Sequence, residues 1–272
     1  MKQFFYLLTL TILISCSTQS KLTKTEESEI SILGSVHFPT ENLNADSIYN
    51  VLLDFKPDLI LTEIDEDKMY KDFTYKNLYN ENEIISIVRY KINHTNVEIR
   101  PIDLFQRNEK RKELGLFSEA SAIFQNLNKL NNENSFNAKE QETWDKFSEY
   151  WEQSEKIGNS NLKTINSKDS DKTIDSLINY QYYKLKDIVK TNELFEKNRL
   201  IDAKNDTITQ RKYFETWANF EMNRNKAIAE NTLEYIKKNP NKRIIISLGF
   251  KHRFFVRKYL EEHGIKLTEF YN

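Results

Sequence analysis

Four short, nearly unbroken apolar runs constrain the fold of this chain more than any other feature of its sequence. They cover residues 30–33, 59–61, 97–102 and 243–248, and a weaker fifth run, 265–270, closes the chain. Unbroken runs rich in β-branched residues are typical of strands buried on both faces of a parallel sheet, whereas half-exposed strands alternate polar and apolar residues. The runs therefore predict an α/β fold with a central, mainly parallel sheet and flanking helices.

Two segments between these runs have helical spacing. Residues 46–58 (DSIYNVLLDFKPD) and 252–264 (HRFFVRKYLEEHG) both place apolar residues three and four positions apart, and the second ends at Gly264. Glycine is a common residue just past a helix C-terminus. The order strand, helix, strand at both ends of the chain predicts α/β units with right-handed crossovers.

The middle of the chain has a different pattern. Between about residues 104 and 210 there is almost no strand signal, and stretches such as ETWDKFSEYWEQSEK place aromatic residues at helical spacing with charges between them. This predicts a long helical insertion between the third and fourth strands, with residues 156–172 as its exposed loop. The insertion is interpreted either as a lid or as a second layer of core.

The first residues predict export rather than folded structure. Residues 1–15 carry Lys2 and a short apolar run, and Cys16, the only cysteine, follows. The pattern resembles the lipobox of bacterial lipoproteins, which implies a signal peptide, a lipidated Cys16 and a flexible tether over 16–29. A plain secretory signal with an incidental cysteine is the alternative. We expect a protein of the bacterial cell envelope, lipid-anchored to a membrane and facing away from the cytoplasm.

Composition sets further limits on the folded body, residues 30–272, which we expect to be a single domain. With one cysteine the chain has no intramolecular disulfide and no cysteine-based zinc site. Its net charge of −1 gives no reason to expect nucleic-acid binding. Nothing in the sequence indicates an oligomeric state.

Two Gly-x-x-His motifs follow apolar runs near opposite ends of the chain. Gly34 precedes His37 and Gly249 precedes His252, in a protein with only five glycines and four histidines. Ligands of parallel sheets bind beyond the carboxyl ends of the strands, so neighbouring strands would bring the two imidazoles together. A single histidine in such a place is more often a structural residue, but the paired placement favours a functional site.

Acidic and basic residues complete this candidate site. Glu63 and Asp65 follow the second run; we assign Glu63 to the site and interpret Asp65 as a helix cap. Two histidines and a carboxylate can bind a divalent ion, and without a metal the same groups can act as general base and orienting partner. Arg100 and Asp103 end the third run as further candidates, although Asp103 would also serve as a cap.

Arg224 lies in the middle of an amphipathic segment, 217–242, that precedes the fourth strand. Such an arginine is either a solvated surface residue or a group that binds a carboxylate or an anionic transition state. We interpret the other two histidines, His94 and His263, as structural.

The order of these motifs resembles the TraB/PrgY/Tiki superfamily, whose fold is similar to that of erythromycin esterases and ChaN-like proteins. The resemblance is carried by LGSVH, TEID, MNRNKAIAEN and LGFKH, over roughly residues 30–65 and 215–265. It implies that His37, Glu63 and His252 line an active centre and that Arg224 takes the place of the family's arginine.

The resemblance implies an active site but does not specify its reaction. Tiki members are metal-dependent peptidases that favour manganese or cobalt, erythromycin esterases are metal-free lactone hydrolases, and ChaN is a haem-binding lipoprotein. We expect a membrane-anchored hydrolase of an amide or ester bond in a small molecule or peptide, either metal-free or with manganese, cobalt or zinc on His37, Glu63 and His252. The alternatives are a lipoprotein that binds haem or a metal without turnover, and an interaction protein that works through its helical insertion.

Overall fold

A computed structural model describes residues 28–77 and 79–271 of the chain. The expected signal peptide, Cys16 and most of the tether lie outside the described residues. In the described part, no helix combines the length and the apolar character needed to cross a bilayer.

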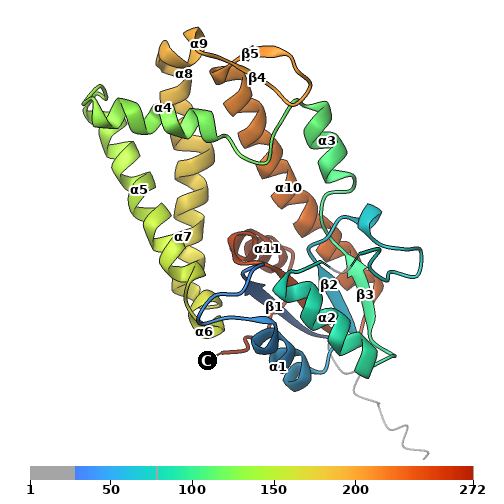
Figure 1. The fold of residues 1–272 in the computed structure, drawn as a ribbon. Coiled ribbons are helices and arrows are strands. Elements are labelled where there is room, and N and C mark those ends of the chain that lie inside the picture. Colours follow the sequence, from blue (N-terminus) through green and yellow to red (C-terminus); the bar gives the residue numbers. More distant parts are fainter. Residues whose placement is uncertain (1–27, 78, 272) are drawn as a thin grey trace, which may run out of the picture.

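Four parallel strands form the central sheet, as the apolar runs predict (Figure 1). In spatial order they are β1 (Glu29–Ser35), β6 (Arg243–Gly249), β2 (Leu59–Thr62) and β3 (Glu98–Pro101). The first and last strands of the sheet along the chain are therefore neighbours, with Ser35 in register with Gly249. This pairing brings the two Gly-x-x-His motifs to the same sheet edge.

Helices cover both faces of the sheet, because successive strand residues point to opposite sides. Leu33, Ile60 and Ile245 belong to the core shared with α1 (Ala45–Phe55) and α2 (Asn82–Asn93). The opposite face packs against α10 (Gln210–Lys238) and α11 (Phe250–Glu262), through residues such as Ile30, Ile32, Leu59, Leu61, Ile228, Ile244, Ile246, Val256 and Leu260. The α/β class predicted from the sequence is confirmed.

Both helices next to the last strand agree with the sequence prediction. The apolar residues of the amphipathic segment that lie in α10, Trp217, Phe220, Ile228, Leu233 and Ile236, are all buried. After α11, Gly264 takes the left-handed backbone conformation with φ of 77°, which confirms its role in ending the helix.

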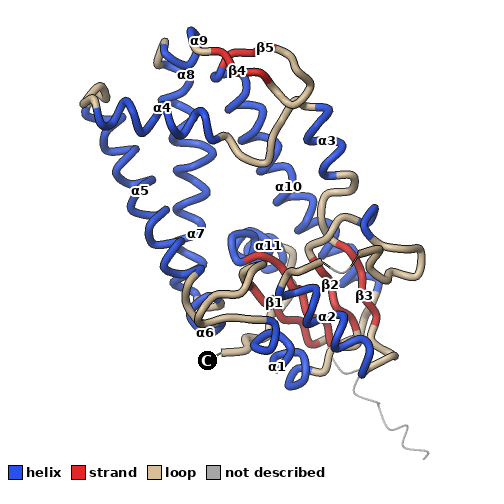
Figure 2. Tube along the Cα trace, viewed as in Figure 1, coloured by secondary structure: helices blue, strands red, loops and turns tan. Residues whose placement is uncertain are grey.

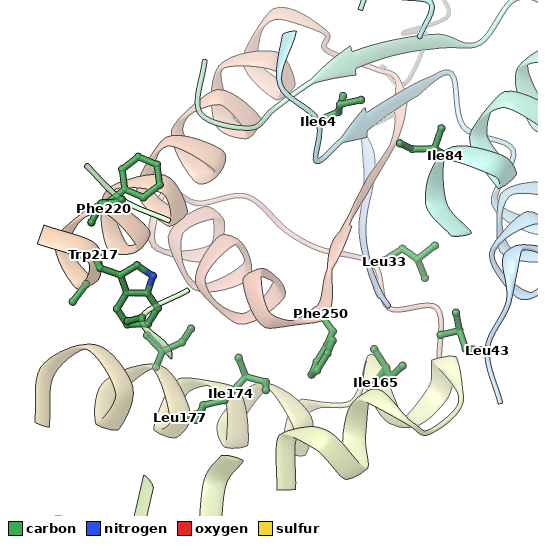
Figure 3. Close-up of a cluster of buried hydrophobic side chains, with 14 of the residues drawn as sticks. Leu33, Leu43, Ile64, Ile84, Ile165, Ile174, Leu177, Trp217, Phe220 and Phe250 are labelled. Atoms are coloured by element: carbon green, nitrogen blue, oxygen red, sulfur yellow. The ribbon is translucent and has the colours of Figure 1, made fainter. Parts of the chain in front are cut away.

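The helical insertion rises from the sheet as an arm (Figures 1 and 2). Its helices are α3 (Arg107–Glu113), α4 (Ser121–Asn132), α5 (Ala138–Gly158), α6 (Leu162–Ile165), α7 (Lys168–Asn179), the π-helical turn η2 (Tyr180–Lys184), α8 (Leu185–Thr191) and α9 (Leu194–Lys197). Figure 3 shows Phe250 of α11 next to Ile165 and Ile174 of the arm. The arm and one face of the sheet share one hydrophobic core, so the insertion is an additional core layer.

Three local predictions are wrong. Among the described residues, 265–270 form no strand: Thr268 donates one backbone hydrogen bond to Ile30, and the rest of the segment adds no ladder. The expected loop over 156–172 instead contains α6 and the start of α7, because Leu162 and Ile165 are buried in the core.

The third is a hairpin that the sequence does not predict. It consists of β4 (Arg199–Ile201) and β5 (Thr207–Thr209), which pair antiparallel just before α10. Each strand has only three residues and neither is buried along its length, so no apolar run marks it.

Asn166, within the segment expected to be a loop, ties the insertion to the sheet. Its side-chain oxygen accepts from the Gly34 N–H at 2.7 Å, and its amide donates to the Gly34 carbonyl at 2.9 Å. Both backbone groups belong to the glycine of the first Gly-x-x-His motif, near the end of β1.

We expect Asn166→Ala to lower the free energy of unfolding by roughly 2–4 kcal/mol, because two buried backbone groups lose their partners. Chemical denaturation measures this directly. Asn159→Ala, which removes an exposed amide bonded to the Glu155 carbonyl, is the control and should change stability by less than about 0.5 kcal/mol. Equal effects of the two substitutions would contradict this role.

Candidate active site

Glu63 is the centre of the candidate site. It follows β2 directly, and its side chain is only 5% exposed. One carboxylate oxygen, Oε1, accepts from Arg224 Nη2 at 2.5 Å and lies 3.3 Å from His252 Nε2. The other, Oε2, accepts from the backbone N–H of Gly249 at 2.7 Å. Burial alone would raise the pKa of Glu63, but the charge of His252, when its ring is protonated, and the charge of Arg224 outweigh it and hold the pKa well below its usual range.

Arg224 is buried rather than solvated. The middle of α10 holds it against β3, where Nε and Nη2 both donate to the Asp103 carboxylate at 2.9 Å. Burial would lower the pKa of Arg224, but the carboxylates of Glu63 and Asp103 raise it above its ordinary value, so the guanidinium stays charged. Asp103 also accepts from Arg107 at 2.7 Å, which extends the network to α3.

His252 lies in the first turn of α11. One of its ring nitrogens faces Asn225, and the other faces Glu63 and Arg224. Nδ1 is 2.5 Å from Oδ1 of Asn225, and Nε2 is 3.3 Å from both Arg224 Nη1 and Glu63 Oε1. In the neutral ring, donation from Nδ1 to Asn225 leaves Nε2 as an acceptor that faces both the Arg224 Nη1–H group and the Glu63 carboxylate. A proton taken up at Nε2 would then be stabilised by the Glu63 carboxylate.

His37 occupies the turn after β1 and is 44% exposed. Its Nδ1 lies 3.2 Å from Glu83 Oε1 on α2. Hydrogen bonding to Glu83, aided by the charge of Glu63, raises the pKa of His37 to about 9 in spite of partial burial. The opposite edge of the ring approaches Gly249, where an added Cβ would lie 3.4 Å from His37 Nε2 and 3.3 Å from Glu63 Oε2. Glycine at 249 therefore keeps this edge of the sheet open.

All four predicted site residues line one cavity of about 270 Å³. Its lining consists of His37, Glu63, Ile64, Lys68, Tyr79, Glu81, Ile84, Arg107, Arg111, Arg224 and His252. The cavity is at the carboxyl ends of the parallel strands, where ligands of such sheets bind. The structure thus brings together the side chains that the sequence assigned to one site.

The expected metal ligands, His37, Glu63 and His252, are not closely gathered in this arrangement, and a metal on them stays a prediction. Within the described part of the chain, His37, Glu63 and His252 are not among the residue sets whose ligand atoms lie within 4.8 Å of one another. The Arg224 guanidinium contacts Glu63 and lies 3.3 Å from His252 Nε2. A positive group already lies against both of those side chains, which opposes a second cation by charge repulsion.

Several other residues singled out in the sequence lie outside the cavity. Asp65 accepts backbone N–H groups from Asp67, Gln106 and Arg107, which confirms its interpretation as a cap. Arg100 pairs with Glu98 instead of turning to the site.

The two remaining histidines are packed on aromatic rings, as expected for structural residues. His94 stacks on Tyr90 and His263 stacks on Tyr259, with ring centroids 4.0 and 4.2 Å apart. Neither lines the cavity.

The sequence does not predict the residues on other elements that position the site. Asn225 and Glu83 contact the two histidines, and Arg111 lines the cavity while it pairs with Glu221 at 2.9 Å. One signal for Glu83 was available, because it is a charged residue beside Ile84 and Ile87 on the buried face of α2. Its partner His37 is not evident from local sequence.

No protein-family model and no curated protein matches this chain. Among solved structures, a histidine-to-asparagine variant of the erythromycin esterase EreC in its open conformation is similar at a TM-score of 0.30 and 13% identity. The match covers 83% of this chain and 61% of the esterase, so the chain spans less than two thirds of that protein.

We expect Arg224→Ala to destabilise the protein by roughly 3–5 kcal/mol, because it leaves Glu63 as a buried carboxylate without its arginine and Asp103 with Arg107 as its remaining guanidinium partner. Urea denaturation at pH 7 measures the loss. Arg100→Ala, which removes a partly exposed ion pair with Glu98, is the matched control and should cost less than about 1 kcal/mol. A small effect at Arg224 would show that the network does not stabilise the fold.

The His37–Glu83 pair should make stability depend on pH. Since folding raises the pKa of His37 from 6.5 to about 9, its contribution is fully present below pH 6.5 and is lost as the pH rises through 9. The difference in unfolding free energy between the wild type and His37→Asn should therefore shrink between pH 6 and pH 9.5, measured with chelator present. A difference that is constant over this range would contradict the raised pKa.

Proposed function

We propose that this protein is a hydrolase that cleaves an ester or amide bond, with His252 as general base. The observation that carries the proposal is the buried Glu63 carboxylate, which lies between a charged arginine and the Nε2 of His252 at the wall of a polar cavity. The order of the sequence motifs supports the same reaction class. The proposal does not rest on fold similarity.

In this proposal His252 activates a water molecule. Asn225 holds Nδ1, so Nε2 takes a proton from water as the resulting hydroxide attacks the substrate carbonyl. Glu63, 3.3 Å from Nε2, stabilises the imidazolium. The proton then passes from Nε2 to the leaving group as the carbonyl–oxygen or carbonyl–nitrogen bond breaks, giving a carboxylic acid and an alcohol or amine.

Arg224 supplies the positive charge that this reaction needs. It lines the cavity while Asp103 and Glu63 hold its guanidinium in place. A prearranged cation beside the attacked carbonyl stabilises the oxyanion of the tetrahedral intermediate without having to reorganise. His37 lies in the same cavity with Nε2 toward Gly249, where it can contact the leaving group.

The cavity also limits the substrate. Its volume of about 270 Å³ is just below the roughly 300–1,000 Å³ typical of ligand pockets. This favours a small acyl group, in a small molecule or at a peptide terminus, over a macrocycle such as haem. A lipid anchor at Cys16, which would place the enzyme at a membrane of the cell envelope, stays a prediction from the sequence.

We expect His252→Gln to lower kcat by about 10²–10⁴-fold with little change in thermal stability, because glutamine occupies similar space but cannot accept and return the proton. The assay is a panel of p-nitrophenyl esters and fluorogenic peptides at neutral pH. His263→Gln, on the exposed end of α11, is the matched control and should retain full activity. Turnover by His252→Gln at the wild-type rate would exclude His252 as the base.

A further inference from the structure

A second group of ligand-type side chains lies beside the candidate active site. His37, Glu81 and Glu83 each offer one donor atom, and these three atoms all lie within 4.8 Å of one another. Residues 36 and 37 are tied to the start of α2: the Asn82 N–H donates to the His37 carbonyl at 2.6 Å, and the Asn82 side chain donates to the Val36 carbonyl at 2.9 Å. The three side chains are thus held together by the backbone.

Glu83 has an unused ligand atom in this group. Its Oε1 accepts from the Ser35 hydroxyl and lies 3.2 Å from His37 Nδ1. Its Oε2 is buried and has no hydrogen-bond partner among the described residues, and the side chain as a whole is only 6% exposed. A buried carboxylate oxygen without a partner is costly, and in native structures it indicates an unseen water or ion.

A small enclosed space accompanies this unpaired atom. Its volume is about 10 Å³, and it is lined by His37, Thr62, Glu63, Glu81, Glu83, Ile84, Ser247 and Leu248. The Ser247 hydroxyl, which also borders it, is a second buried polar atom without a partner in the described chain. A space of this size holds one water-sized particle.

We propose that His37, Glu81 and Glu83 bind one divalent transition-metal ion such as Mn²⁺ or Zn²⁺. One imidazole nitrogen with two carboxylate oxygens suits these ions, whereas Mg²⁺ and Ca²⁺ prefer oxygen ligands alone. Ligand atoms that share an ion at about 2.0–2.2 Å lie closer together than the 4.8 Å limit of this cluster, so binding requires some contraction, and it displaces the proton that the raised pKa places on the His37 ring at neutral pH. Arg224 neither belongs to this ligand set nor lines the small space, so ion binding would leave it in place.

Ion binding can be tested without hydrolysis, since neither Arg224 nor His252 belongs to the ligand set or lines the small space, although Glu63 borders it. A second set of acidic residues, Asp65, Asp67 and Glu109, has similar spacing but is not part of the proposed site. In that set both oxygens of Asp65 already accept backbone N–H groups, from Gln106 and Arg107. Asp67 also has an oxygen without a partner in the described chain, but neither Asp67 nor Glu109 is a buried residue, so the set provides a control for the buried site.

Calorimetric titration of the chelator-treated full chain with MnCl2, ZnCl2 and MgCl2 tests the site. We expect one Mn²⁺ or Zn²⁺ per chain, weaker Mg²⁺ binding, and a Kd at least about tenfold higher in Glu81→Ala and in His37→Ala. Glu81 precedes α2 without capping it through its side chain, so its removal should leave the fold intact, which circular dichroism verifies. Glu109→Ala should bind as the wild type does.

Two results would overturn the proposal. One is the absence of Mn²⁺ and Zn²⁺ binding to the folded wild type, in which case a water molecule fills the space. The other is unchanged affinity in Glu81→Ala or a loss specific to Glu109→Ala, which would place the ion elsewhere. Neither result depends on finding a hydrolysed substrate, so failure of this site and failure of the hydrolase proposal are distinguishable.

Discussion

The buried ion pair between Glu63 and Arg224 is the constraint on which the rest of the site depends. A carboxylate that is 5% exposed stays ionised only if a cation and hydrogen-bond donors replace the water it has lost. Arg224 and the Gly249 N–H do this. Because Arg224 must also satisfy Asp103, the pair fixes α10 against β2 and β3 and so positions the wall of the cavity.

The order of the strands explains why groups so far apart in the sequence meet. With β6 between β1 and β2, the turns that carry His37, Glu63 and His252 emerge from three adjacent strands. Glycine at 249 leaves room for His37 and Glu63 to approach each other. The two ring nitrogens of His37 then face different environments, Glu83 on one side and the cavity on the other, which allows one residue to serve both the candidate active site and the proposed ion site.

Local patterns predict the parts of this molecule that depend on local interactions. Unbroken apolar runs identify all four strands of the sheet, and two Gly-x-x-His motifs with Glu63 and Arg224 identify the cavity. The run at 265–270 is not a strand, because a strand needs a full ladder of backbone hydrogen bonds to a neighbouring strand. The polar stretch around Asn166 has the composition of a loop, and its partner, Gly34, is 132 residues away. Glu83, Asn225 and Arg111 escape prediction for the same reason: each acts through a contact that only the fold creates.

A double-mutant cycle between Glu63→Gln and Arg224→Gln tests the central claim most directly. If the two charges stabilise each other in the buried site, the cycle should give a favourable coupling of about 1–3 kcal/mol in the free energy of unfolding. The double variant should then be more stable than the sum of the two single losses predicts. Additive losses within about 0.5 kcal/mol would mean that the two side chains do not interact. That result would contradict the role of the Glu63–Arg224 pair in holding the cavity wall together.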